Sequence, residues 1–409
     1  MPKHHVVLVP GFFGFGNLGE VTYFHGVREA LQRSLLAHAV DAHVVEVPTL
    51  PTASIRHRAA RVVDTLARVA QGTSGPIHVV GHSTGGLDAR LAVAPTASVP
   101  ATAKFEAYDR LRTLVTVSTP HFGTPLAEHF GSAAGFHLLR LLALLTQTAI
   151  TRAHLPLGLA LRIGGLITRL DDRLGFQDTV ADAFFRDIIA DFSPKRREEL
   201  VSFIEGISND TSLIFQLTPA GCDLLNASTA DPKTLRYGSV VTRAEPPRLS
   251  NLLAFKHNPY AHSMHALYAL LYRFAKAGPR DQFPAPVPQQ RLKLELAFGA
   301  YPELSWSDGI VPTLSQIWGE VIHATSADHL DVVGHYGVLR PGEATSDWLP
   351  SRSGFDEPAF DALWNDVAAF IAREAQSPSV QYPHNVGTER TQVELQSLRE
   401  RVQGKRAPK

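Results

Sequence analysis

Short apolar runs alternate with longer amphipathic stretches along the first 130 residues. The runs are rich in valine, isoleucine or leucine and are bounded by turn residues, which is typical of strands buried on both faces of a parallel sheet. Between them, residues 23–37 and 55–70 carry apolar positions three and four apart, which predicts helices. This alternation predicts a parallel sheet built from strand–helix–strand units. The expected strands are residues 6–9, 44–47, 77–80 and 114–117.

The strand pattern returns in the second half of the chain. Residues 239–242, 292–298 and 321–324 are expected to form strands. The proline-rich stretch 283–288 predicts a loop, and residues 358–375 predict a last amphipathic helix.

The pattern divides the chain into an α/β core, an inserted segment and a tail. Residues 1–130 and 206–375 are expected to form the two parts of the core, and residues 376–409 a polar, flexible tail. Residues 131–205 are expected to form a helical lid or cap. The first 40 residues of this insertion are leucine-rich and contain four arginines but no acidic residue. Such a segment suits a lid that opens at a lipid surface, and it equally suits a helix buried in the core or in a dimer interface.

The composition argues against several classes of protein. The 409 residues contain 39 Lys and Arg against 39 Asp and Glu, so no basic excess favours nucleic-acid binding. The single cysteine, Cys222, excludes an intrachain disulfide and a multi-thiolate metal site. No signal peptide is apparent and no apolar stretch reaches the roughly 20 residues of a spanning helix. We therefore expect a cytoplasmic protein without a transmembrane segment, with export by another route left open.

The strongest chemical signal follows the expected strand 77–80. Gly81–Gly86 reads Gly-His-Ser-Thr-Gly-Gly and is followed by a helical pattern. A serine hydroxyl becomes a nucleophile when a tight strand-to-helix turn holds it exposed beside a base, and small flanking residues allow that turn. The segment predicts a nucleophile elbow with Ser83 as the nucleophile, against the alternative of an ordinary glycine-rich turn.

An acyl-transfer site also needs two backbone N–H groups that face the developing oxyanion. The predicted donors are Thr84, directly after the nucleophile, and Phe12, in the loop after the first strand. The same loop contains Gly-x-Gly-x-x-Gly at Gly14–Gly19, and Glu46 could imitate a ribose-binding acid. A dinucleotide fingerprint needs its first glycine at the strand end, whereas four residues intervene here. The glycines are therefore interpreted as part of a tight loop.

In hydrolases of this plan the acid and the base follow the serine along the chain. Asp308, in the segment Trp306–Pro312, is the predicted acid, and His329 is the predicted base, with His335 as the second candidate. A surface Asp-Gly turn is the alternative for Asp308. The 19 histidines do not form a His-Glu-x-x-His motif, and the group at 257, 262 and 265 lacks a thiolate or a suitable set of carboxylates. No metal and no cofactor are expected.

These motifs resemble those of the bacterial true lipases, the triacylglycerol lipase branch of the α/β-hydrolase fold. The resemblance extends from about residue 6 to residue 335, in the order of that family. It implies an α/β-hydrolase fold, a triad of Ser83, Asp308 and His329, and an oxyanion hole at Phe12 and Thr84. It also places a helical lid at 131–170 and one calcium ligand at Asp331, although His335 stands where a neutral amide is expected. The matching segments are 9–14, 23–27, 81–86, 118–124, 216–219, 307–312 and 329–331.

The predicted function is therefore hydrolysis of carboxylic esters of a lipid-like kind through an acyl-enzyme. Acyltransferase, phospholipase and polyester depolymerase reactions use the same triad and stay open as alternatives. A non-catalytic binding protein with this fold is the remaining alternative. The expected partners are an acyl-ester substrate and, by transient contact of the cap, a lipid surface.

Overall fold

A computed structural model describes nine segments of the chain. These are residues 3–12, 23–50, 52–72, 74–95, 97–131, 212–248, 259–278, 283–337 and 349–376. The expected lid lies outside the described residues except for Gly131, and so does the tail except for Gln376. The Gly-x-Gly-x-x-Gly stretch also lies outside them.

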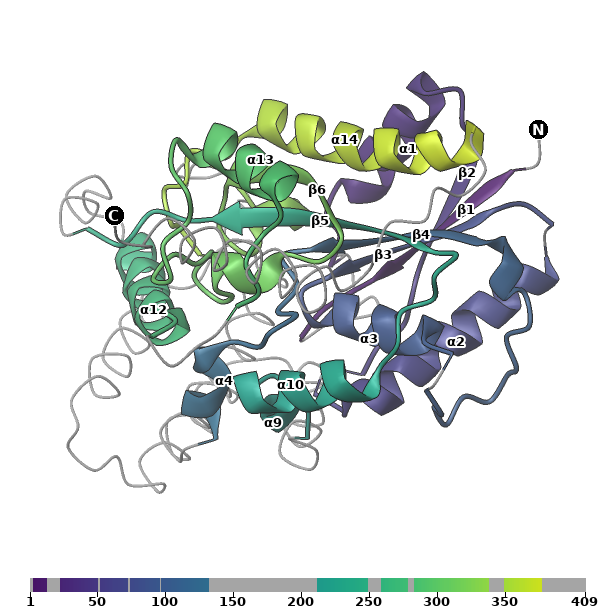
Figure 1. The fold of residues 1–409 in the computed structure, drawn as a ribbon. Helices are drawn as coiled ribbons and strands as arrows, with labels where there is room; N and C mark the ends of the chain where they lie inside the picture. Colours follow the sequence, from purple (N-terminus) through teal and green to yellow (C-terminus); the bar gives the residue numbers. More distant parts are fainter. Residues whose placement is uncertain are drawn as a thin grey trace, which may run out of the picture.

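A six-stranded parallel sheet forms the centre of the molecule (Figure 1). Its strand order is β2-β1-β3-β4-β5-β6, and every neighbouring pair is parallel. All the strands predicted from the apolar runs are confirmed, apart from the one at 292–298. The strands are β1 (His4–Val9), β2 (Ala42–Glu46), β3 (Ile77–His82), β4 (Leu111–Val117), β5 (Arg236–Arg243) and β6 (Glu320–Ser326).

Helices cover both faces of this sheet, as Figure 1 shows. Helices α1 (Val27–Ala37) and α14 (Glu357–Gln376) pack on one face, and α2 (Ile55–Gln71) and α3 (Thr84–Val93) pack on the other. This arrangement, with a sharp turn between β3 and α3, is the α/β-hydrolase fold. The other described helices are α4 (Pro125–Phe130), α9 (Ser212–Gln216), α10 (Pro219–Ser228), α12 (Pro259–Ala275) and α13 (Pro288–Phe298), with short 3-10 turns η1 (Tyr108–Arg110), η2 (Thr313–Gln316) and η3 (Asp331–Val333).

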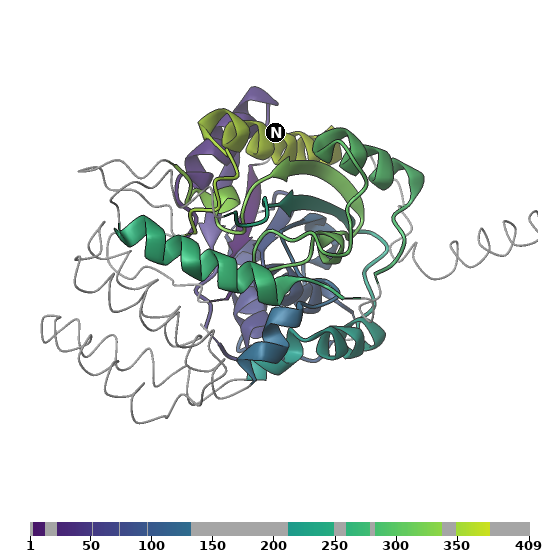
Figure 2. The same cartoon turned by 90° about the vertical axis from the view of Figure 1, so that its left-hand side faces the viewer.

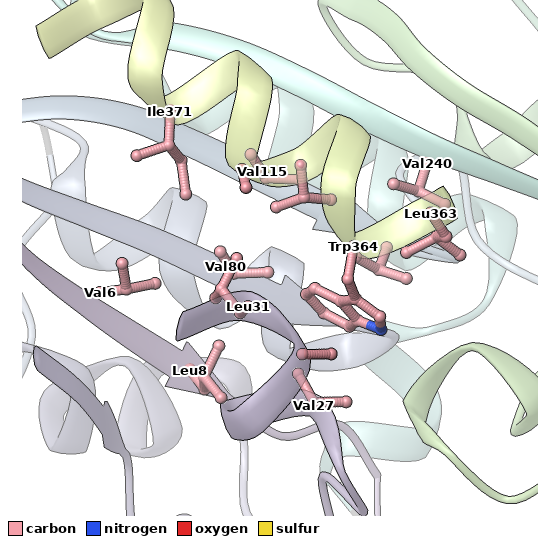
Figure 3. Packing of buried hydrophobic residues seen from close by; sticks show 14 of the residues in the cluster. Val6, Leu8, Val27, Leu31, Val80, Val115, Val240, Leu363, Trp364 and Ile371 are labelled. Carbon is pink, nitrogen blue, oxygen red and sulfur yellow. The ribbon is translucent and has the colours of Figure 1, made fainter. Parts of the chain in front are cut away.

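Two hydrophobic layers result from the alternation of side chains along the strands. In β1, Val6 and Leu8 face α1 and α14, whereas Val7 and Val9 face α2 and α3. Trp364 of α14 is fully buried and packs in the layer between the sheet and helices α1 and α14, as Figure 3 shows. The apolar runs of the inner strands β1, β3 and β4 are buried on both faces of the sheet, and this explains why the runs were sufficient to locate these strands.

Residues 292–298 form a helix, so the expected strand there is wrong. The alternation of Leu292, Leu294 and Leu296 with charged residues suggested a strand with one buried face. Only Leu294 is buried, while Leu292 and Leu296 are exposed. Helix α13 instead begins with Pro288 in its first turn and ends at Phe298, followed by Gly299 with a φ of 74°. The proline at its start and the glycine after its end favour a helix over the strand that the alternation suggested.

The helix expected at 23–37 is shorter than predicted. Helix α1 begins only at Val27 because Gly26 has a φ of 67° and interrupts the helical backbone. Tyr23 and Phe24 therefore lie outside the helix. Within the described residues, no helix is long and apolar enough to cross a membrane. Helix α12 crosses in front of the carboxyl ends of the strands, as Figure 2 shows.

Burial keeps four histidines of the described core neutral: His78, His82, His121 and His335. It lowers the pKa of His78 to about 3 and of His335 to about 4, and it holds the pKa values of the other two well below their usual range. Burial acts in the opposite direction on two carboxyls, since it raises the pKa of Asp88 and of Asp328 to about 6.

The protein is expected to lose stability as the pH falls below 6.5. Below that pH the unfolded chain protonates its histidines, whereas these four stay neutral in the native state. The two carboxyls with raised pKa values, Asp88 and Asp328, bind protons in the native state below about pH 6, which stabilises it. They offset only part of the stability lost through the four histidines, because they are fewer. The free energy of unfolding from denaturant titrations should fall by about 3 kcal/mol or more between pH 7.5 and pH 5. Equal values at the two pH values would contradict this role of the buried histidines.

Candidate active site

Ser83 occupies a strained turn between β3 and α3. Its φ of 54° lies in the left-handed region, which is unusual for a residue other than glycine. A Cβ on Gly81 would lie 2.5 Å from the carbonyl oxygen of Gly85, so the turn requires glycine at Gly81. The Ser83 N–H donates to the carbonyl of Val117, 2.8 Å away in β4. The turn therefore holds the serine at the carboxyl end of the central strands.

The three residues predicted as nucleophile, base and acid come together through hydrogen bonds. His329 Nε2 lies 2.9 Å from Ser83 Oγ, and His329 Nδ1 lies 2.8 Å from Asp308 Oδ2. The side chain of Asp308 is fully buried and that of His329 is 6% exposed. The His329 N–H also donates to the carbonyl of Asp308 at 3.0 Å. This geometry selects His329 over His335 as the partner of the serine.

The Asp308 carboxylate is surrounded by donors from the protein. Its Oδ1 accepts the backbone N–H groups of Ile310 at 3.0 Å and Val311 at 2.8 Å. Its Oδ2 accepts Thr242 Oγ1 at 3.0 Å and Gln316 Nε2 at 3.3 Å. These fixed donors replace the water that burial removes, so the carboxylate is held in one orientation. Thr242 and Gln316 carried no recognisable signal in the sequence.

The predicted oxyanion donors lie on two segments that adjoin Ser83. Thr84 is the first residue of α3, where backbone N–H groups have no acceptor within the helix. Phe12 follows Gly11, and a Cβ on Gly11 would lie 2.6 Å from Ser83 Cβ. The loop after β1 thus passes directly beside the serine, as an oxyanion loop must.

Arg58 of α2 connects these two segments, although no motif in the sequence indicated it. The side chain is fully buried and pairs with Asp88 of α3 at 2.8 Å. Its Nη2 donates to the carbonyls of Pro10 at 2.9 Å and Gly11 at 3.0 Å, and lies 3.3 Å from Thr84 Oγ1. Arg58 therefore fixes the loop after β1 to the start of α3. The available signal was its position on the apolar face of the helix predicted at 55–70.

The residues that resemble a calcium site do not fit one. Asp331 Oδ2 accepts the Asp328 N–H at 2.8 Å and the Ser353 hydroxyl at 2.7 Å, so protein donors occupy this oxygen. His335 Nε2 donates to the carbonyl of Tyr23 at 3.0 Å. In the described part of the chain, no three His, Cys, Asp or Glu side chains are grouped so that they could hold a metal ion.

Glu46 and His265, which the sequence associated with a nucleotide site and a metal site, have structural partners. Glu46 pairs with Arg28 at 3.3 Å, and burial raises its pKa. His265 is buried and its Nδ1 donates to the carbonyl of Pro350 at 2.9 Å. We therefore interpret both side chains as structural.

Comparison with known proteins points to ester hydrolysis. Residues 1–160 match the model of a family described as putative serine esterase (DUF676). No curated protein sequence matches the chain. Together with the fold, the family match places the protein among the enzymes that hydrolyse carboxylic esters.

Several solved structures are similar to this chain. The lipase from Staphylococcus hyicus has 14% sequence identity and a TM-score of 0.49, with 92% of this chain and 97% of that chain covered. Lipase 1 from Pelosinus fermentans has 19% identity and a TM-score of 0.46, with 90% and 99% covered. EstA from Clostridium botulinum has 17% identity and a TM-score of 0.46, with 92% and 88% covered.

Proposed function

We propose that this ester hydrolase works through a triad of Ser83, His329 and Asp308 and a covalent acyl-enzyme. The observation that carries the proposal is the continuous chain of hydrogen bonds from Ser83 Oγ through the His329 imidazole to the Asp308 carboxylate, with distances of 2.9 Å and 2.8 Å. The nucleophile, the base and the group that orients the base thus stand in the order that acyl transfer requires.

In the first half of the reaction, Ser83 Oγ attacks the acyl carbon and passes its proton to His329 Nε2. Asp308 accepts the Nδ1–H and stabilises the imidazolium. His329 then protonates the leaving alcohol oxygen as its bond to the acyl carbon breaks, which leaves the acyl group on Ser83. In the second half, His329 takes a proton from water and the resulting hydroxide attacks the acyl carbon. The bond between Ser83 Oγ and the acyl carbon then breaks, and His329 returns the proton to Oγ. The products are one alcohol and one carboxylic acid.

The oxyanion formed in each half accepts the backbone N–H groups of Phe12 and Thr84. Two observations support this assignment: Thr84 begins α3, and Gly11 packs against Ser83. Arg58 binds the carbonyl oxygens of Pro10 and Gly11, which fixes the orientation of the backbone in this loop. Removal of one such donor typically costs about 100- to 1000-fold in kcat.

For the substrate, we propose a lipid-like acyl ester, as the resemblance to bacterial true lipases implies. The supporting observation is the leucine-rich composition of residues 131–170, which include four arginines and no acidic residue. A segment of that composition favours contact with acyl chains and anionic headgroups. An ester with a long acyl chain would then be preferred over a short, soluble one.

A chain-length series tests this substrate class. Hydrolysis of p-nitrophenyl and glyceryl esters, from short soluble chains to long emulsified ones, should show higher kcat/KM for the emulsified long chains. Equal or greater activity on short soluble esters would overturn the lipid-like substrate but not the ester hydrolysis. The same reactions with added alcohol distinguish hydrolysis from acyl transfer, because a transferase forms the new ester in preference to the free acid.

A further inference from the structure

His82, directly before the nucleophile, makes two hydrogen bonds outside the triad. Its Nε2 lies 2.9 Å from the backbone carbonyl oxygen of His329, and its Nδ1 lies 2.6 Å from the hydroxyl of Tyr23. A carbonyl oxygen only accepts, so Nε2 carries the ring proton and Nδ1 accepts from the Tyr23 hydroxyl. These two contacts define a single tautomer of His82.

Tyr23 extends this connection to the loop that carries Phe12. The Tyr23 hydroxyl oxygen lies against Gly11, because a Cβ on Gly11 would lie 2.8 Å from that oxygen. The hydroxyl thus contacts the oxyanion loop and donates to His82. Strands β1 and β3 are neighbours in the sheet (Figure 1), which explains why Gly11, after β1, and His82, at the end of β3, lie close together.

The backbone around Tyr23 is also attached to the loop that follows His329. The Tyr23 carbonyl accepts His335 Nε2 at 3.0 Å, and the His25 N–H donates to the Val333 carbonyl at 2.9 Å. A Cβ on Gly334 would meet the carbonyl of His25, so the two segments are in close contact. The segment 23–25 therefore contacts both the oxyanion loop and the histidine loop.

We propose that Tyr23 and His82 are positioning residues, which hold the backbone of His329 and the oxyanion loop in register with Ser83. The proposal deepens the proposed function and rests on it. The relay runs from Gly11, which lies against the Tyr23 hydroxyl, through that hydroxyl to His82 Nδ1, and from His82 Nε2–H to the His329 carbonyl. It joins the base and the oxyanion donors, two parts of the site whose relative placement determines the rate of acyl transfer.

The electrostatics of the relay suit this role. The ring centroids of His82 and His329 are 4.8 Å apart, so a charged His82 would oppose the imidazolium that forms on His329. Burial lowers the pKa of His82 well below its usual range, which keeps the ring neutral. Burial raises the pKa of Tyr23, so its hydroxyl keeps the proton that it donates. The relay therefore orients His329 without adding a charge beside it.

A second histidine of the same strand provides a matched control. His78 is also fully buried in β3, and its Nδ1 lies 2.9 Å from the hydroxyl of Thr113. This histidine–hydroxyl pair lies at the opposite end of the strand from Ser83. Thr113→Val therefore removes a similar buried hydrogen bond at a distance from the reacting atoms.

The test compares variants with the wild type in ester hydrolysis: Tyr23→Phe, His82→Leu, the double variant and Thr113→Val. Tyr23→Phe should lower kcat about tenfold, and His82→Leu about 10- to 100-fold, with KM changed less than about threefold. The double variant should lose no more than His82→Leu alone, because both act through one relay. His82→Gln, which keeps a donor and an acceptor, should recover part of the kcat lost in His82→Leu. Thr113→Val should keep the wild-type kcat.

Three outcomes would overturn the relay: a wild-type kcat in Tyr23→Phe, additive losses in the double variant, or the same loss in Thr113→Val. Tyr23→Phe carries the test if His82→Leu does not fold, since it removes a single oxygen atom. Failure of the proposed function has a different signature, because the wild type itself would then show no ester turnover and no reaction of Ser83 with a fluorophosphonate.

Discussion

Replacement of Ser83 by alanine is expected to lower kcat for ester hydrolysis by about 10⁴- to 10⁶-fold, with the fold unchanged. The reason is that Ser83 Oγ is the only atom of the proposed triad that forms a bond with the acyl carbon. Its hydroxyl contacts His329 Nε2 at 2.9 Å, so its loss leaves the imidazole in place but without a nucleophile. The measurement is initial-rate kinetics with a p-nitrophenyl ester, together with thermal unfolding of both proteins.

Ser239→Ala is the control for this variant. Ser239 is a fully buried serine of β5 whose hydroxyl lies 3.4 Å from the carbonyl of Glu320. It should keep the activity of the wild type, because it removes a buried hydroxyl of the same kind away from His329. Activity of Ser83→Ala at the level of Ser239→Ala would contradict the assignment of the nucleophile.

Replacement of Asp308 by asparagine is expected to lower kcat by about 10⁴-fold. Asparagine has nearly the same shape, so the backbone N–H groups of Ile310 and Val311 keep an acceptor. The amide NH₂ that then faces His329 Nδ1 selects the wrong tautomer of the imidazole, whose Nε2 would carry a hydrogen and could not take the Ser83 proton. Asparagine also provides no negative charge for the imidazolium. The measurement is kcat for the same p-nitrophenyl ester.

A second His–Asp pair, with the same distance between nitrogen and oxygen, provides the control for Asp308→Asn. His323 Nδ1 lies 2.8 Å from Asp366 Oδ2, but the Asp366 side chain is 44% exposed and the pair lies between β6 and α14. Asp366→Asn should leave kcat unchanged, since this pair lies outside the triad. If both variants lost activity equally, or if Asp308→Asn stayed active, the role of Asp308 as the orienting carboxylate would be wrong.

The sequence predicted the parts of the fold that depend on burial and on patterns within a short stretch of chain. The inner strands β1, β3 and β4 are buried on both faces, so their apolar runs were visible without any tertiary information. Ser83, Asp308 and His329 could be proposed as site residues because each stands in a local motif, and the structure joins them by hydrogen bonds. The hydrogen bond between Ser83 and His329 joins residues 246 positions apart, and only the order of the motifs indicated it.

The features that the sequence did not predict depend on contacts distant in the chain. Leu292 and Leu296 alternate as in a strand, yet neither is buried, and the ends of α13 decided its structure. Arg58 and Asp88 are charged residues within helical patterns, and nothing in either segment showed that they would form a buried pair. Tyr23 was expected in a helix, whereas its hydroxyl bonds to His82, 59 residues away. Contacts between residues that are distant along the chain leave no periodic pattern in the local sequence.

The central claim is that Ser83 is the residue that becomes acylated, and covalent labelling tests it most directly. The protein is treated with a fluorophosphonate, its mass is measured intact, and the modified peptide is sequenced by tandem mass spectrometry. We expect one phosphonyl group per chain, attached to Ser83 of the peptide that contains Gly81–Gly86, with loss of ester hydrolysis in proportion to labelling. A chain that hydrolyses esters but carries the label on another residue, or remains unlabelled, would contradict the claim.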